Sequence, residues 1–310
     1  MKRALILLSV ALVFGCNKTI VFTDSIVTAK SVCDTTPIVI VVGPAQSLEV
    51  DKQYATDITI PSGYAMAFKG LATRTGSFVQ WDNLPNENEN ASGSGLTSEL
   101  HFNEATLLPS FIKTFHQLTN RRLFIVKYAY AGTLQGWNLL NAANQKGLNW
   151  GAQGSGTIQA NGRDFPLFKW WTQTIDSFLK RSNLTRGDVS QVIYNLGYSD
   201  AVKLNTFPNL KNFSYDDLYD LLVRVHQFLP NAKINIIQVA QASTPNSNGF
   251  KLARQNQDSV IKVLPYCTII DTSLKHYPVS WTVDGLHPNN IGFDTLGARV
   301  ARNMVAKYNY

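Results

Sequence analysis

Five short apolar runs along the chain predict the strands of a parallel sheet. The first, residues 38–42, is Ile-Val-Ile-Val-Val, and a run that is apolar at every position is typical of a strand covered on both faces. The other four lie at residues 122–128, 189–196, 233–239 and 268–271. A further short strand is expected near residues 65–68, inside a polar stretch that otherwise indicates a surface excursion.

Between these runs, apolar residues recur every three or four positions, which predicts amphipathic helices. The expected helices cover residues 104–119, 168–179, 217–229, 249–264 and 291 onward. Strands that alternate with helices favour an α/β fold. We therefore predict one domain over residues 37–310, a three-layer doubly wound (flavodoxin-like) sheet of about five parallel strands.

The first residues predict an export signal. Lys2 and Arg3 precede an apolar segment over residues 4–14, which is too short to span a bilayer as a mature helix. Val-Phe-Gly-Cys at residues 13–16 resembles a bacterial lipobox, so Cys16 is the candidate for a lipid that anchors the protein to a membrane. Residues 1–16 are then the signal and residues 17–36 a polar tether. The expected location is a periplasmic or cell-surface lipoprotein, with secretion as the alternative.

Composition and charge bear on the size of the core, on binding to nucleic acid and on disulfide pairing. The chain has 310 residues, 45% of them hydrophobic, which is enough to bury a full core. Its formal net charge is +7, but the basic residues are scattered and do not alternate with aromatic ones, so nucleic acid is not expected as a partner. Cys33 and Cys267 could pair in an exported protein, or Cys267 could be a buried strand residue; the sequence leaves both open.

The candidate chemistry begins with Asp284 and His287, three residues apart just before the last helix. A carboxylate that holds a histidine ring makes a general base, although a lone Asp-x-x-His also arises by chance. Ser47 follows the first strand and Gly132 the second. Because the carboxyl ends of parallel strands share one edge, Ser47 is placed to be a nucleophile, and the N–H groups of Ser47 and Gly132 to stabilise an oxyanion. Taken alone, Ser47 and Gly132 also suit ordinary turns.

A long loop rich in Gly, Asn and Gln, residues 138–164, is flanked or interrupted by tryptophans. Trp137 and Trp150 are candidate platforms for a sugar ring, since an aromatic face packs well on a pyranose. Of Trp170 and Trp171, which fall within a predicted helix, at least one is expected to belong to the core.

Four segments together carry a family resemblance. They are Ala-Gln-Ser-Leu at residues 45–48, Lys-Tyr-Ala-Tyr-Ala-Gly-Thr at 127–133, Gly-Tyr-Ser-Asp-Ala at 197–201, and Asp-Gly-Leu-His-Pro-Asn at 284–289. In order and spacing they resemble the blocks of the SGNH hydrolases, specifically the sialate O-acetylesterase and acetylxylan esterase branch. The resemblance covers residues 37–305.

The resemblance implies a serine esterase that needs no metal or organic cofactor. Ser47 would attack the acyl carbonyl, His287 would carry the proton to the leaving alcohol, and Asp284 would orient His287. Many SGNH hydrolases use an Asn as a third oxyanion donor, and Ser199 stands at that position in this chain. The resemblance also implies substrate contacts from the other block residues, Gln46, Gly197 and Asp200. The expected substrate is an O-acetylated glycan or a small ester.

The chain departs from the family pattern at the nucleophile block and at residue 198. Ala45 replaces a Gly, and an alignment through Gly43 would put Ala45 where the nucleophile belongs; the Ser47 register is preferred because Gln46-Ser47-Leu48 is retained. Tyr198 replaces a Glu. Two alternatives therefore stay open: a non-catalytic glycan-binding lipoprotein with a degenerate site, and an SGNH lipase or thioesterase.

Overall fold

The protein is described by a computed structural model. The described residues are 36–45, 65–68, 70–72, 78–80, 106–129, 133–136, 138–143, 150, 167–240, 248–282 and 285–310. The expected signal, lipid site and most of the tether, as well as Cys33, lie outside this range.

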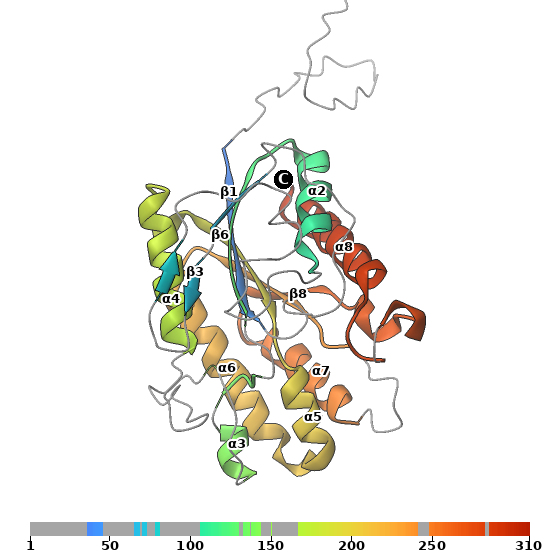
Figure 1. Ribbon diagram of the computed structural model, residues 1–310. Helices are drawn as coiled ribbons and strands as arrows, with labels where there is room; N and C mark the ends of the chain where they lie inside the picture. The colour runs from blue at the N-terminus through green and yellow to red at the C-terminus, as the bar shows by residue number, and fades with distance from the viewer. Residues whose placement is uncertain are drawn as a thin grey trace, which may run out of the picture.

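Six parallel strands form the main sheet (Figure 1). In spatial order they are β2 (Ala65–Phe68), β5 (Leu123–Ala129), β1 (Ile38–Ala45), β6 (Val189–Asn195), β7 (Lys233–Ile237) and β8 (Cys267–Asp271). The five predicted strands are confirmed, and the short strand expected at residues 65–68 adds the sixth, at one edge. A separate antiparallel pair, β3 (Gly70–Ala72) with β4 (Phe78–Gln80), was not predicted.

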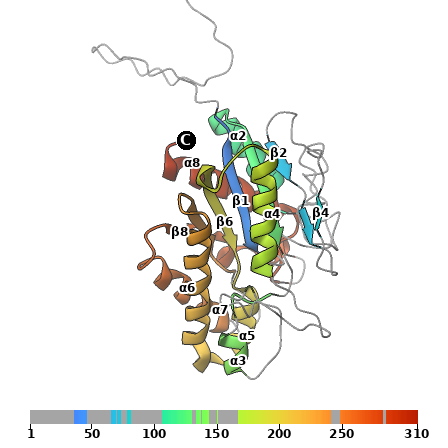
Figure 2. The ribbon, with the colours of Figure 1, turned by 90° about the vertical axis from the view of Figure 1, so that its left-hand side faces the viewer.

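Two layers of helices cover the sheet. The helices are α2 (Leu108–Thr119), α3 (Asn138–Ala142), α4 (Leu167–Arg181), α5 (Tyr198–Thr206), α6 (Lys211–Phe228), α7 (Asn248–Val260) and α8 (Asn290–Tyr308), with single 3-10 turns η2 (Arg186–Asp188), η3 (Pro208–Leu210), η4 (Ser273–His276) and η5 (Val279–Trp281). Helices α2 and α8 pack on one face, α4 and α6 on the other (Figures 1 and 2). Helices α3 and α5 lie beyond the carboxyl ends of the strands.

The alternation of side chains along β1 divides the core in two. Ile38, Ile40 and Val42 pack toward α2 and α8, whereas Val39 and Val41 pack toward α4 and α6. All five side chains are at most 3% exposed. A strand buried on both faces must be apolar throughout, which is why the sequence showed no period of two here.

Helix α2 shows how the sequence sets an element and its ends. Phe111 and Phe115, one turn apart, are fully buried, which is the expected result of an apolar face with helical spacing. Pro109 lies in the first turn, where its missing N–H costs nothing. Asn120 ends the helix in the left-handed conformation, with its N–H donating to the His116 carbonyl. Truncating Phe111 to Ala would cost about 3–5 kcal/mol.

The strand order indicates where a binding site is expected. From β1 the chain runs to β2 and then β5 on one side of β1, and afterwards to β6 on the other side, so the direction of winding reverses between β1 and β6. This is the flavodoxin-like order, with β2 added beyond β5. In such sheets ligands bind outside the carboxyl ends of the two strands that flank the reversal. The residues that follow β1 and β6 are therefore the first candidates for a site.

Candidate active site

The end of β1 bears on whether Ser47 or Ala45 stands at the position of the nucleophile. Ala45 is the last residue of the strand, is fully buried, and pairs with Ala129 of β5 and Asn195 of β6. Because the Ala45 side chain is fully buried, no substrate reaches it, so Ala45 occupies a position unsuited to a nucleophile. Gln46 and Ser47, the next two residues in the sequence, lie outside the described residues.

Gly197 opens α5 at the end of β6. Its φ of 118° lies in the left-handed region, and a Cβ here would meet Val239 Cγ1 at 3.0 Å and the Gln135 side-chain nitrogen at 3.1 Å. Both the backbone and the crowding require glycine. The glycine predicted from the third block thus lets three strand ends approach one another, because Gln135 follows β5 and Val239 follows β7.

The side chains of Gln257 and Tyr198 connect the segments that follow β6 and β7 by hydrogen bonds. Gln257 of α7 donates its side-chain N–H to the Leu196 carbonyl at 3.3 Å and accepts the Val239 N–H at 3.1 Å. The Tyr198 hydroxyl accepts the Ala240 N–H at 2.9 Å, and burial raises the pKa of this phenol. This buried phenol holds the segment that follows β7.

His287 lies in a loop that is closed by backbone contacts at its base. Thr282 and Pro288 form an isolated antiparallel bridge, and the Asn289 N–H donates to the Trp281 carbonyl at 2.8 Å. Asn289 then caps α8, its side-chain oxygen accepting the Gly292 N–H at 3.1 Å.

The position of this loop at the sheet follows from the direction of α8. Its last residues lie at the amino ends of the strands, since the Gln191 amide at the start of β6 bonds the Tyr310 hydroxyl. The loop before α8 therefore lies toward the carboxyl edge, with His287 half-buried. Asp284 lies outside the described residues, so the pairing with His287 stays a prediction.

The remaining predicted site residues fall into three groups. Ser199, in the first turn of α5, is half-buried. Asp200 and Trp150 are fully buried, so in this structure neither side chain is open to a ligand. Gly132 and Trp137 lie outside the described residues.

Trp150 is part of the core that supports the edge. Its Nε1 donates to Thr133 Oγ1 at 2.9 Å, and its ring meets Tyr128 edge to face with centroids 6.0 Å apart. The substrate contact predicted for Trp150 finds no support in these contacts, because no face of the ring is free for a sugar. Trp171 is also fully buried, which confirms that at least one tryptophan of α4 belongs to the core.

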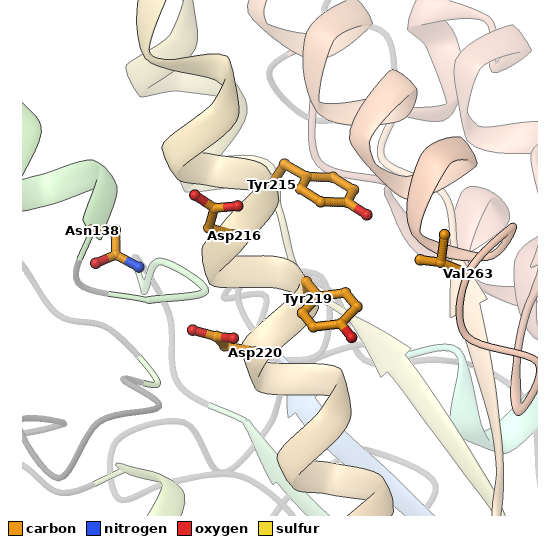
Figure 3. A pocket seen from close by; sticks show the side chains of 6 residues that line it. All are labelled: Asn138, Tyr215, Asp216, Tyr219, Asp220 and Val263. Carbon is orange, nitrogen blue, oxygen red and sulfur yellow. The ribbon is translucent and has the colours of Figure 1, made fainter.

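A hollow of about 550 Å³ opens along α6 (Figure 3). Its lining residues are Asn138, Tyr215, Asp216, Tyr219, Asp220 and Val263. The rings of Tyr215 and Tyr219 are stacked with centroids 6.3 Å apart and point toward Val263, whereas the two carboxylates point toward Asn138. None of the residues predicted for the active site lines this hollow.

Cys267, the third cysteine of the sequence, lies in β8 as a buried free thiol. Burial raises its pKa to about 12, so the sulfur stays protonated and unreactive at neutral pH. Within the described residues no group of His, Cys, Asp and Glu side chains is arranged to hold a metal ion. No helix in that part of the chain is long and apolar enough to cross a membrane.

Comparison with known proteins supports the fold. No family model and no curated protein sequence matches the chain. Among solved structures, a protein from Arabidopsis thaliana aligns with a TM-score of 0.52 at 12% identity, over 87% of this chain and 99% of that one. At this identity the match shows a shared fold and no more.

Two further similar structures have TM-scores below 0.5. One is NanS, with a TM-score of 0.49 and 10% identity over 89% of this chain and 98% of that one. The other is a family 2 carbohydrate esterase with a carbohydrate-binding domain from Myceliophthora fergusii, with a TM-score of 0.46 and 12% identity over 88% of this chain and 67% of that one.

Two residues that organise this edge, Gln257 and Asp217, were not predicted from the sequence. Gln257 falls on an amphipathic helix as one more polar position. Asp217 stands beside Asp216 and near Asp220, a pattern typical of a solvated helix face. Yet Asp217 is only 2% exposed. Its apolar neighbour Leu218 was the available signal, since Asp217 borders the buried stripe of α6.

Proposed function

We propose that the protein is a serine esterase that removes O-acetyl groups from carbohydrate. Ser47 is the nucleophile, His287 the general base and acid, and Asp284 the group that orients His287. The N–H groups of Ser47 and Gly132 stabilise the tetrahedral oxyanion, at a few kcal/mol per donor. Ser199 is a candidate third donor and Gln46 a candidate substrate contact.

The observation that carries this proposal is the position of Ala45. Ala45 is the fully buried last residue of β1, next to the point where the winding reverses, and residues 46 and 47 follow it in the sequence. This favours the Ser47 register over the one that would leave the site without a nucleophile. The loop that carries His287 reaches the same edge, and Gly197 opens a helix there.

The acetyl-glycan substrate rests on the four sequence blocks. A covalent lipid on Cys16, with residues 17–36 as tether, would hold the enzyme at a membrane and place it among extracellular or periplasmic glycans. Metabolic labelling with a radioactive fatty acid tests this anchor: label should enter the wild type and be absent from Cys16→Ala. Label in both variants would rule out Cys16 as the lipid site.

Hydrolysis of p-nitrophenyl acetate tests the esterase. We expect Ser47→Ala and His287→Ala each to lower kcat by about a thousandfold or more. His276→Ala, in the preceding 3-10 turn, is the matched control and should keep kcat within about twofold, as expected for a residue outside the triad. Unchanged hydrolysis in Ser47→Ala would rule out the assigned nucleophile, and an inactive wild type would favour the non-catalytic glycan-binding alternative.

A series of p-nitrophenyl esters from acetate to octanoate separates the acetylesterase from a lipase or thioesterase. A small acyl pocket should make kcat/KM fall with chain length, since added methylenes would have to displace packed atoms. A rise with chain length would overturn the acetyl preference. Release of acetate from a panel of acetylated glycans then identifies the sugar.

A further inference from the structure

Asp217 of α6 caps a helix to which it does not belong. Its Oδ1 accepts the Asn138 N–H and its Oδ2 the Leu139 N–H, each at 2.9 Å. These are the first two residues of α3, whose leading N–H groups have no partner within their own helix. One buried carboxylate thus satisfies two backbone donors that come from the chain between β5 and α4.

Asp200 of α5 holds the same stretch at its other end. Its Oδ2 accepts the Gln135 N–H at 3.2 Å, and the side chain is fully buried. Two carboxylates from two helices therefore accept hydrogen bonds from the backbone N–H groups of residue 135 and of residues 138 and 139. We refer to these contacts of Asp200 and Asp217 as the clamp.

Gly136 lies between these two sets of contacts, against Asp217. A Cβ at this position would come within 2.2 Å of Asp217 Oδ1 and 2.5 Å of its Cγ. No side chain fits there unless the carboxylate moves. The glycine is needed for close approach to Asp217, so the sequence of the stretch and the carboxylate are matched to each other.

Holding the stretch with carboxylates is electrostatically unfavourable. Burial, and then the charge of Asp217, raise the pKa of Asp200 to about 8. Burial also raises the pKa of Asp217 to about 6, although the N–H groups of Leu139 and Asn138 counteract this. The Asp200 Oδ1 atom has no hydrogen-bond partner. Groups retained at a cost in stability are most often found where function needs them.

We propose that Asp200 and Asp217 are positioning residues for the esterase reaction: by holding the backbone at residues 135, 138 and 139 they restrain the chain that follows Gly132 in the sequence. This inference rests on the proposed function, in which the Gly132 N–H binds the oxyanion. Gly132 precedes Gln135 by three residues. A donor that shifts by about 1 Å can cost a hundredfold in rate, so loss of the clamp should lower kcat.

Variants of Asp217 in the full-length protein test the proposal. With p-nitrophenyl acetate, Asp217→Ala should lower kcat by about 10- to 100-fold and change KM by less than about threefold, because the oxyanion forms only after binding. Asp217→Asn keeps one acceptor oxygen and should fall between Ala and the wild type. Asp216→Ala is the matched control: this neighbouring carboxylate is exposed, and kcat should stay within about twofold.

Gly136→Ala disrupts the same contacts of Asp217 by changing the glycine that packs against its carboxylate. The added methyl group displaces the carboxylate while Asp217 remains in the chain, so kcat should fall as it does in Asp217→Ala. The double variant Gly136→Ala/Asp217→Ala should be no slower than either single one, since both act through one contact. A multiplicative loss in the double variant would contradict a shared contact.

Amide hydrogen exchange separates this inference from the proposed function. The N–H groups of Asn138 and Leu139 should exchange at least about tenfold faster in Asp217→Ala than in the wild type, and at the wild-type rate in Asp216→Ala. Unchanged exchange in Asp217→Ala would overturn the clamp, whether or not the protein is an esterase. Faster exchange with unchanged kcat would overturn its role in positioning, and an inactive wild type would refute only the esterase.

Discussion

Two buried carboxylates near the carboxyl edge of the sheet, Asp271 and Asp200, differ in what surrounds them. Asp271 ends β8 and is 2% exposed. Its Oδ1 accepts the Ser273 N–H at 2.6 Å, and its Oδ2 faces Arg299 Nε at 3.2 Å and the Asn303 amide at 3.4 Å. Both carboxylate oxygens of Asp271 accept hydrogen bonds, and the Arg299 guanidinium forms a salt bridge with one of them.

Asp200 is equally buried but poorly paired. One oxygen accepts the Gln135 N–H, the other has no partner, and the charge of Asp217 raises the pKa of Asp200 further. The comparison shows that burial alone does not decide what a carboxylate does. Asp271 stabilises the fold through its partners. Asp200 instead holds a loop in place and resists ionisation.

The largest expected effect on stability is the loss of Asp271. Asp271→Ala leaves Arg299 without its partner and the Ser273 N–H without its acceptor, so the free energy of unfolding should fall by about 2–4 kcal/mol. Urea denaturation at pH 7 measures this. Asp258→Ala is the control, since this exposed carboxylate accepts a single bond from Gln238 and should cost less than about 1 kcal/mol. Equal losses in the two variants would contradict the assigned role.

Asp200→Asn should have a smaller effect that depends on pH. The pKa of Asp200 is about 8 in the folded protein against 3.8 for the ordinary carboxyl, so the folded state binds the extra proton between these values. Wild-type stability should therefore fall as pH rises from about 4 to about 8 and level off above. Because Asn does not titrate, the free energy of unfolding of the variant should increase relative to that of the wild type as pH rises across this window.

Urea denaturation at pH 5, 6.5 and 8 checks this prediction. The difference between Asp200→Asn and the wild type should grow at each step. Asp217→Asn provides an internal comparison, because the folded pKa of Asp217 is about 6 and its pH-dependent difference should be complete by about that pH. A difference for Asp200→Asn that is the same at all three pH values would show that its carboxyl is not perturbed.

The contrast also explains what the sequence could predict. The strands and their order of appearance were predictable because uninterrupted β-branched runs such as 38–42 admit few other structures. Gly197 was predicted only to follow the third strand as a substrate contact; its left-handed backbone, which favours glycine, was not predicted. The antiparallel pair β3–β4 was not predicted, because three-residue strands in a polar stretch leave too little pattern.

The clamp could not be predicted, because it depends on residues far apart in the chain. Asp217 receives the N–H of Asn138 across 79 positions, and nothing local distinguishes it from its solvated neighbour Asp216. Trp150 fails as a sugar platform for a similar reason. Its loop suggested exposure, and only the packing against Tyr128 shows that the ring is core. Pairing and burial at such positions are tertiary properties.

The smallest expected effect comes from a carboxylate that is well paired but exposed. Asp176 of α4 binds Arg186 through two bonds of 2.8 and 2.7 Å, with both side chains more than 40% exposed. Asp176→Asn should cost less than about 1 kcal/mol, and the loss should shrink further in 0.5 M salt. Arg186→Ala should cost more than Asp176→Asn, because the guanidinium also lies 4.0 Å from the centroid of the Phe228 ring. Equal losses for the two variants would show that the ring contact contributes nothing. A loss for Asp176→Asn as large as that for Asp271→Ala would show that burial does not determine how much a paired carboxylate contributes to stability.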